Sequence, residues 1–399
     1  MGKWMSETRF ALRSSEGSSQ LNWALDRLQI ETCWQRGLTG AGVRIGHLDT
    51  GVDSKHPMLC DRIATFAQFD PWGDRVPNAQ PWDSGNHGTH TAGLLCGEAM
   101  PSAHGNVSGI APQAKLCSGM VIEGGHPLVR VLAGLDWLLD QQIRVLCLSL
   151  GVPGYNPLFE IVLARLRQQG VLTVCPIGNQ GRRIACSPAN YPGVLAVGAI
   201  NDQDQVPGFS GSGVAIVAPG VHLLSAQPDG NFASQTGTSM AAAIVAGVAA
   251  LLFQAKPTAT VEEVEQALLK SCTPLPHLPP QRVGHGLINP IAAVEYLLNG
   301  KECDLAPFPI SEIPHRVDPR LLRQLDAANL EDLIAAIALV SGNREPILQR
   351  LHRPPIQLKW IPSANAIALM ATPDVLYALL DEPEVYFLSS TTIDPFYLG

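Results

Sequence analysis

Hydrophobic and polar positions between residues 43 and 271 form two kinds of segment that alternate along the chain. Short runs of apolar, largely β-branched residues predict buried strands. They lie at residues 43–48, 115–122, 145–150, 171–176 and 194–200. Longer stretches with apolar residues at helical spacing predict helices. They lie at residues 128–141, 158–169, 240–253 and 261–271. This alternation predicts an α/β fold with a doubly wound, mostly parallel sheet.

The pattern changes after a proline-rich stretch at residues 306–314. Seven elements are predicted there, in the order helix, strand, helix, strand, strand, helix and strand. They lie at residues 319–328, 332–340, 344–352, 356–361, 366–371, 373–381 and 385–391. Apart from its leading helix, this order is the β-α-β-β-α-β unit of a ferredoxin-like α+β domain. We therefore predict an N-terminal arm (1–20), a larger α/β domain (21–300), a Pro-rich linker (301–316) and a smaller ferredoxin-like domain (317–399).

Composition and charge agree with a globular protein of more than one domain. The 399 residues exceed one typical domain, and 46% are hydrophobic. The net charge of -8 argues against nucleic acid as the main partner, because phosphate binding needs concentrated Lys and Arg. No apolar run suits a signal peptide, and none is expected to span a membrane. The nine cysteines lack paired spacing, which favours buried thiols in a reduced compartment and a cytoplasmic location.

Three short segments carry the candidate chemistry, each with one reactive side chain close to glycine. They are residues 45–51 with Asp49, residues 86–93 with His87, and residues 237–242 with Ser239. A serine hydroxyl needs an imidazole to take its proton and a carboxylate to hold that imidazole in the right tautomer. Asp49 ends a predicted strand, where open α/β sheets place their sites. Ser239 opens a predicted helix, whose amino end favours developing negative charge.

In this order and with these flanks, the three segments resemble those of the subtilisin-family serine proteases, the subtilases. Residues 109–112, 191–194 and 284–289 continue the likeness, which covers about residues 21–299. It implies a subtilisin-like fold and a serine endopeptidase that forms an acyl-enzyme through Asp49, His87 and Ser239. It also implies that Asn179 stabilises the oxyanion together with the backbone N–H of Ser239. The alternative is that Asn179 only supplies a turn after Gly178.

The resemblance also implies where an extended peptide substrate binds. Two segments would pair with it as strand edges, namely Ser149, Leu150 and Gly151, and Glu123, Gly124 and Gly125. Glycine in a loop is equally the ordinary expectation at such positions. Cys186 lies near the expected specificity pocket, where packing is the favoured role. The side-chain preference stays open.

One departure from the family concerns calcium. The family continues to a calcium-binding Asp after His-Pro, but here Met58 follows His56 and Pro57. The family's calcium loop is also replaced, by residues 100–106. Calcium needs six or more oxygen ligands, which a thioether does not supply. We therefore expect this site to be empty, and no metal or other cofactor is predicted.

The smaller domain resembles the subtilase propeptide, an inhibitor and folding chaperone, although here it follows the protease. Residues 317–322 and 373–380 carry that likeness. One hypothesis is that residues 392–399 occupy the substrate cleft and leave the enzyme autoinhibited by this intramolecular partner. The alternative is a docked domain that only stabilises the protease. For the whole chain, a peptide ligase using the same acyl-enzyme and a non-catalytic scaffold are the other hypotheses.

Overall fold

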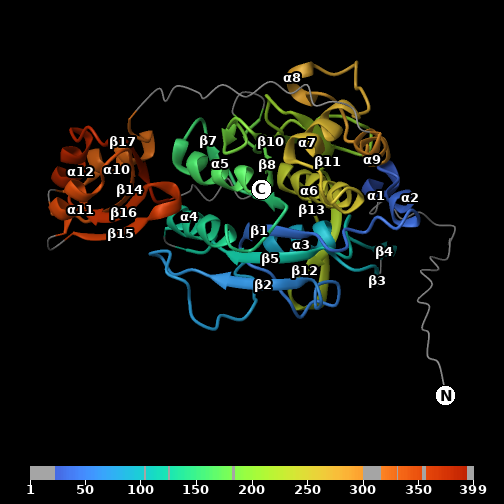
Figure 1. Cartoon of the computed structure of the whole chain (residues 1–399), viewed down its shortest axis with the longest axis horizontal. Coiled ribbons are helices and arrows are strands. Elements are labelled where there is room, and N and C mark those ends of the chain that lie inside the picture. Colours follow the sequence, from blue (N-terminus) through green and yellow to red (C-terminus); the bar gives the residue numbers. More distant parts are fainter. Residues whose placement is uncertain are drawn as a thin grey trace.

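The computed structural model describes residues 23–102, 105–124, 126–181, 185–299, 316–329, 331–352 and 356–392. Its larger part is built on a seven-stranded sheet in which every neighbouring pair of strands is parallel. In spatial order the strands are β11 (Ile216–Pro219), β10 (Val194–Ile200), β8 (Leu172–Pro176), β6 (Val145–Cys147), β1 (Arg44–Asp49), β5 (Lys115–Met120) and β2 (Ile63–Gln68) (Figure 1). The predicted parallel sheet is confirmed.

Helices cover both faces of this sheet. One face carries α3 (His87–Cys96) and α6 (Thr238–Ala255), and the other carries α4 (Pro127–Leu138) and α5 (Glu160–Gln168). Strand β1 shows the division, because neighbouring residues of a strand point to opposite faces. His47 contacts Thr91 of α3, whereas a Cβ on Gly46 would lie 3.0 Å from the Leu138 side chain of α4. A side chain at Gly46 would therefore push α4 away from the sheet.

The remaining elements of the larger part surround these layers. They are α1 (Trp23–Arg27), α2 (Ile30–Gln35), β3 (Met100–Ser102), β4 (Gly105–Val107), β7 (Val152–Pro153), η2 (Pro157–Phe159), β9 (Cys186–Ser187), β12 (Leu223–Gln227), η3 (Pro228–Gly230), β13 (Asn231–Gln235), α7 (Val261–Lys270), α8 (Pro280–Val283) and α9 (Pro290–Leu298).

Helix α6 runs through the core of the larger part. It begins at Thr238, before Ser239, and ends at Ala255, so it is longer than predicted. It also corrects the expectation that no stretch could cross a membrane, because it is long and apolar enough by length and composition. However, 89% of it is buried inside the fold, as expected for the central helix of a packed domain.

The C-terminal module, residues 316–392, has the predicted ferredoxin-like arrangement. Its elements are α10 (Pro319–Ala327), β14 (Ile334–Val340), α11 (Glu345–Leu351), β15 (Gln357–Ile361), η4 (Pro362–Ala364), β16 (Ala366–Ala371), α12 (Pro373–Leu380) and β17 (Val385–Ser390). The strands form one antiparallel sheet in the order β15-β16-β14-β17. The predicted β-α-β-β-α-β order is confirmed, with boundaries that differ by at most two residues.

The module sheet is apolar on both faces, and the two faces have different partners. Residues such as Ala336, Ala338 and Ile367 pack with the module's own helices. Their neighbours in sequence, among them Ile337 and Leu339, belong to the same buried cluster as the core of the larger part. This second face lies against α4 and α5, with β15 and η4 making the contacts (Figure 1). The module is therefore docked on the larger part through an apolar surface.

The predicted domain boundaries stay predictions. The arm at residues 1–20, almost all of the linker at 301–316, and residues 393–399 of the tail lie outside the described residues. Eight of the nine cysteines are described, all as free thiols, and six of them are buried. Cys60 is exposed, so the expectation of buried thiols does not hold for every cysteine.

Candidate active site

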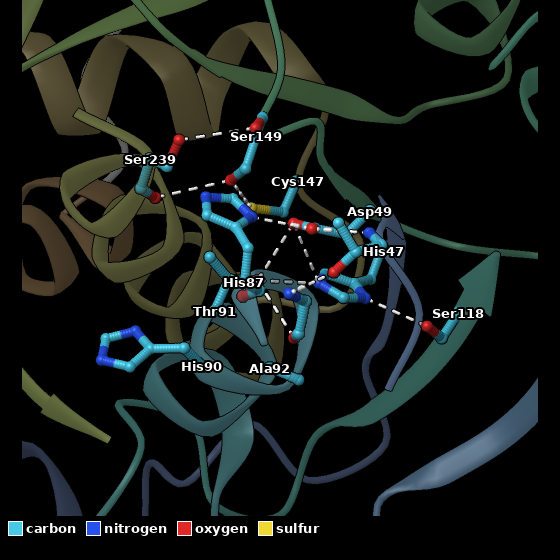
Figure 2. Close-up of polar contacts among 12 residues, drawn as sticks. His47, Asp49, His87, His90, Thr91, Ala92, Ser118, Cys147, Ser149 and Ser239 are labelled. Atoms are coloured by element: carbon cyan, nitrogen blue, oxygen red, sulfur yellow. Dashed lines mark hydrogen bonds and ion pairs between the residues drawn. The ribbon is translucent and has the colours of Figure 1, made fainter. Parts of the chain in front are cut away.

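The carboxyl ends of neighbouring parallel strands bring the candidate residues together. Asp49 ends β1, and His87 begins α3, which packs against β1. His87 Nδ1 donates to Asp49 Oδ1 at 2.7 Å, and the same oxygen accepts the Thr50 N–H at 2.7 Å (Figure 2). Asp49 is 0% exposed and His87 is 5% exposed. The structure therefore forms the predicted acid and base pair in a site shielded from water.

The charges of this pair are mutually stabilised. Burial acts to raise the pKa of the Asp49 carboxyl, but His87 and the Thr50 N–H outweigh it, so that the pKa lies below its usual value. Burial acts to lower the pKa of His87, but the charge and hydrogen bond of Asp49, with a smaller effect of Asp83, raise it above the ordinary value. Asp49 is therefore ionised at neutral pH, and His87 is a stronger base than a free imidazole.

Ser239 lies at the opposite side of the imidazole, at the start of α6. Its Oγ donates to the carbonyl oxygen of Ser149 at 3.4 Å, and the Ser149 hydroxyl donates to the Ser239 carbonyl oxygen at 3.4 Å (Figure 2). His87 Nε2 is buried and has no hydrogen-bond partner among the described residues. In this structure the Ser239 hydroxyl is therefore bonded to Ser149 and not to His87.

Asn179 follows β8 and is fixed at the start of α6. Its Oδ1 accepts from the Thr238 N–H at 3.0 Å and from the Thr238 hydroxyl at 2.9 Å. Both bonds use the oxygen, which leaves the side-chain NH2 group to donate elsewhere. The Ser239 N–H is among the first four of its helix, which lack an acceptor within it. These two donors lie on adjoining elements, as an oxyanion site requires.

The two predicted substrate segments follow the strands on either side of β1. Ser149, Leu150 and Gly151 follow β6 and are buried. Glu123 and Gly124 follow β5, where Glu123 is half-buried and Gly124 is exposed. Gly125 lies outside the described residues. Cys186 is buried beside Gly151, where a Cβ on the glycine would lie 2.9 Å from the Cys186 Cβ. This burial of Cys186 agrees with the packing role that the sequence favoured.

Two groups that the sequence did not reveal support Asp49 and His87. Asp83 accepts the Thr50 hydroxyl at 2.7 Å and, with its other oxygen, the N–H and hydroxyl of Thr89 at 2.8 and 2.6 Å. It thereby ties the end of β1 to the start of α3. Thr91 Oγ1 lies 3.2 Å from Asp49 Oδ2. Asp83 has no motif around it, so the sequence held no signal for this role.

The region expected to lack calcium is occupied by packed side chains and a hairpin. Met58 is 1% exposed, and β3 and β4 pair as two antiparallel strands. In the part of the chain that the structure describes, no group of three or more His, Cys, Asp or Glu side chains lies close enough to hold a metal ion. The expectation of an empty calcium site stays a prediction.

A family model described as the subtilase family matches residues 40–286, which contain all the candidate residues above. The chain belongs to the subtilase family. This subtilase is 38% identical over 275 residues to M-protease from Shouchella clausii (strain KSM-K16), covering 68% of this chain and 69% of that protein. It is 37% identical over 275 residues to Subtilisin Savinase from Lederbergia lenta, covering 68% and 97%. It is 32% identical over 289 residues to Subtilisin E from Bacillus subtilis (strain 168), covering 70% and 73%.

Family membership makes the chain a subtilisin-like serine endopeptidase. The family match ends at residue 286, so it does not reach the C-terminal module. The likeness of that module to a propeptide therefore stays a prediction from the sequence and from its fold.

Proposed function

We propose that this subtilase hydrolyses peptide bonds with Ser239 as nucleophile, His87 as general base and Asp49 as the group that orients His87. The observation that carries this assignment is the buried 2.7 Å bond from His87 Nδ1 to Asp49, while Nε2 of the same ring has no partner in the described part of the chain. Because Nδ1 carries the proton given to Asp49, the neutral ring has its lone pair on Nε2. That lone pair is the acceptor that the Ser239 proton needs.

The reaction then follows from the geometry. Ser239 Oγ leaves the Ser149 carbonyl, gives its proton to His87 Nε2 and attacks the substrate carbonyl carbon. Asp49 stabilises the imidazolium without taking its proton. The oxyanion receives the Asn179 side-chain NH2 and the Ser239 N–H. His87 gives the proton to the leaving amine, and water releases the acyl group by the same steps in reverse.

We also propose that the substrate lies extended between residues 149–151 and residues 123–125. These segments follow β6 and β5, the two neighbours of β1 in the sheet, so they flank the strand end that carries Asp49. Backbone pairing of this kind gives affinity without selecting side chains. A peptide or protein is therefore the expected partner of the site.

We further propose that the C-terminal module inhibits this site. The end of the module lies beside the substrate segment 123–125. The Leu128 N–H donates to the Thr391 carbonyl at 3.2 Å, and Thr391 Oγ1 lies 2.8 Å from His126 Nδ1. Leu128 is the second residue of α4, so Thr391 satisfies a donor that the helix itself leaves open.

The place of Thr391 beside His126 supports the same proposal. An extended chain gains about 3.3 Å per residue, so the residues after Thr391 need only a short path to the proposed substrate segment, which ends next to His126. In this arrangement the tail binds as a product does, and substrate must displace it.

Peptide and casein hydrolysis tests the catalytic assignment and the inhibition by the C-terminal module. We expect a chain truncated after Lys301 to be more active than the full chain, and Ser239→Ala to be inactive in either length. Activity that survives in Ser239→Ala would contradict the catalytic assignment. Intact masses of the products distinguish hydrolysis from ligation. Hydrolysis adds one water for each bond cut, whereas a ligase joins the acyl group to an amine, so its product lacks the mass of that water. A truncated chain that is insoluble or inactive would instead assign the module to folding or stability.

A cytoplasmic location stays a proposal, which fractionation of expressing cells tests.

A further inference from the structure

A second imidazole lies behind the Asp49 carboxylate. His47 is two residues before Asp49 on β1, so both side chains point to the same face of the sheet. It is 0% exposed. Its Nδ1 lies 3.0 Å from Oγ of Ser118 on β5, and its Nε2 lies 2.9 Å from Oγ1 of Thr91 on α3 (Figure 2). The same Nε2 is 3.7 Å from Asp49 Oδ2.

The partners of the Thr91 hydroxyl fix the direction of these hydrogen bonds. Thr91 Oγ1 lies 3.1 Å from the carbonyl oxygens of His87 and Gly88, and 3.2 Å from Asp49 Oδ2. All three oxygens can only accept, and the hydroxyl has one proton to give. The buried, ionised Asp49 carboxylate is the acceptor that most needs this proton. When Thr91 donates to Asp49 Oδ2, the short contact with His47 requires a proton on Nε2, with His47 as donor. Ser118 consequently donates to Nδ1 of the neutral ring.

We propose that His47 is a positioning residue for the proteolytic reaction, whose Nε2–H holds the Thr91 hydroxyl in the orientation that donates to Asp49 Oδ2. Asp49 is then held at both oxygens. Oδ1 accepts from His87 and from the Thr50 N–H, and Oδ2 accepts from Thr91. The inference rests on the proposed role of His87 as general base.

This series of donors changes the basicity of His87. A carboxylate that accepts more hydrogen bonds binds a proton less well. Asp49 then stabilises the protonated form of His87 less strongly. The neutral form of His87, which takes the Ser239 proton, therefore persists to lower pH than it would without His47.

The surroundings of His47 keep it neutral, as a donor of this kind must be. Burial lowers its pKa, against the opposing effect of Asp49 on its own strand and of Asp83 before α3, whereas His87 on α3 lowers it further. Cys147 lies in register with it on β6, and burial raises the pKa of that thiol to about 12. The neutral imidazole thus donates without placing a second positive charge near His87.

Two amide substitutions separate this role from simple packing. The side-chain NH2 group of glutamine reaches the position of histidine Nε2, whereas the shorter asparagine reaches only that of Nδ1. His47→Gln therefore keeps a donor for Thr91, and His47→Asn keeps only the contact with Ser118. We expect His47→Asn to raise the pKa of His87 by about half a pH unit, or about 0.7 kcal/mol. His47→Gln should leave it close to that of the unmodified chain.

The pKa of His87 is measured in the full chain by NMR titration of the histidine ring protons, and again as the acidic limb of kcat/KM. On that limb His47→Asn should lower kcat/KM about threefold at a fixed pH, since half a pH unit is a factor of about three. Thr91→Val, which removes the intermediate hydroxyl, should give the same shift. Combining it with His47→Asn should add little, because both act through one path.

Equal shifts in the glutamine and asparagine variants would overturn the proposal. So would a loss of stability and kcat with no change in the pKa of His87, since either result makes His47 a packing residue. The NMR measurement needs no turnover. The two proposals can therefore fail separately. If the unmodified chain hydrolyses no peptide, the proposed function fails. If His47→Asn still raises the pKa of His87 and His47→Gln does not, the influence of His47 on Asp49 and His87 stands.

Discussion

Replacing Ile361 by alanine tests whether docking of the C-terminal module inhibits the protease. Ile361 ends β15, is 3% exposed, and lines a cavity of about 200 Å³ together with Ala133 and Trp137 of α4. In an undocked chain this face of the module sheet is open to water. The substitution therefore removes apolar contact mainly from the docked state, and we expect faster peptide hydrolysis.

The size of the effect follows from the burial of Ile361. Truncating a buried isoleucine to alanine typically costs about 2–5 kcal/mol, depending on how its surroundings collapse. The lower value applies here, because the neighbouring cavity already limits the contacts of the side chain. A loss of about 2 kcal/mol changes the docking equilibrium about 30-fold. The rate should rise by up to that factor, with the rate of the chain truncated after Lys301 as its upper limit.

Docking is followed in the same samples by hydrogen exchange of the Leu128 amide, whose acceptor is the Thr391 carbonyl. The matched control is Leu322→Ala, because Leu322 lies on α10 and is 37% exposed. It should change neither exchange nor hydrolysis. If Ile361→Ala speeds exchange at Leu128 and leaves hydrolysis unchanged, docking does not inhibit the enzyme. If neither changes, the energetic contribution assigned to this interface is wrong.

Three further predictions concern the site and its stability. Asn179→Ala should lower kcat by about 10²–10³, the loss seen when the corresponding amide of subtilisin is removed; steady-state kinetics should show KM little changed. Asp49→Asn should lower kcat about 10⁴-fold with the fold intact by circular dichroism, because His87 loses the partner that fixes its tautomer; a small effect would contradict the role of Asp49. Burial lowers the pKa of His90 to about 4. Protonation then favours the unfolded chain, so stability should fall by up to about 3 kcal/mol as pH decreases from 6.5 to 4. Urea unfolding of His90→Gln should show a smaller pH dependence, and an equal one would contradict this cause.

Local sequence was sufficient for five of the seven strands of the central sheet and for choosing the candidate residues, whereas β2 and β11 were not predicted. Apolar runs of strand length specify buried parallel strands, because a strand covered on both faces has no polar side to alternate with. The strand that ends at Asp49 and the helix near Ser239 were both predicted, and the predicted strand at residues 194–200 matches β10. The order of Asp49, His87 and Ser239 with their glycine-rich flanks pointed to the family, which the comparisons confirm.

Only the tertiary structure decided which groups surround these residues. Asp83 and Thr91 serve the pair through contacts with residues on other elements, and no periodicity or motif records such a contact. The face of the module sheet that packs on α4 reads as an ordinary core face in the sequence, because an apolar strand residue does not reveal which partner covers it. His47 is the plainest case. A polar residue in a buried strand shows only that it must have partners, and the packing of β5 and α3 against β1 made those partners Ser118 and Thr91.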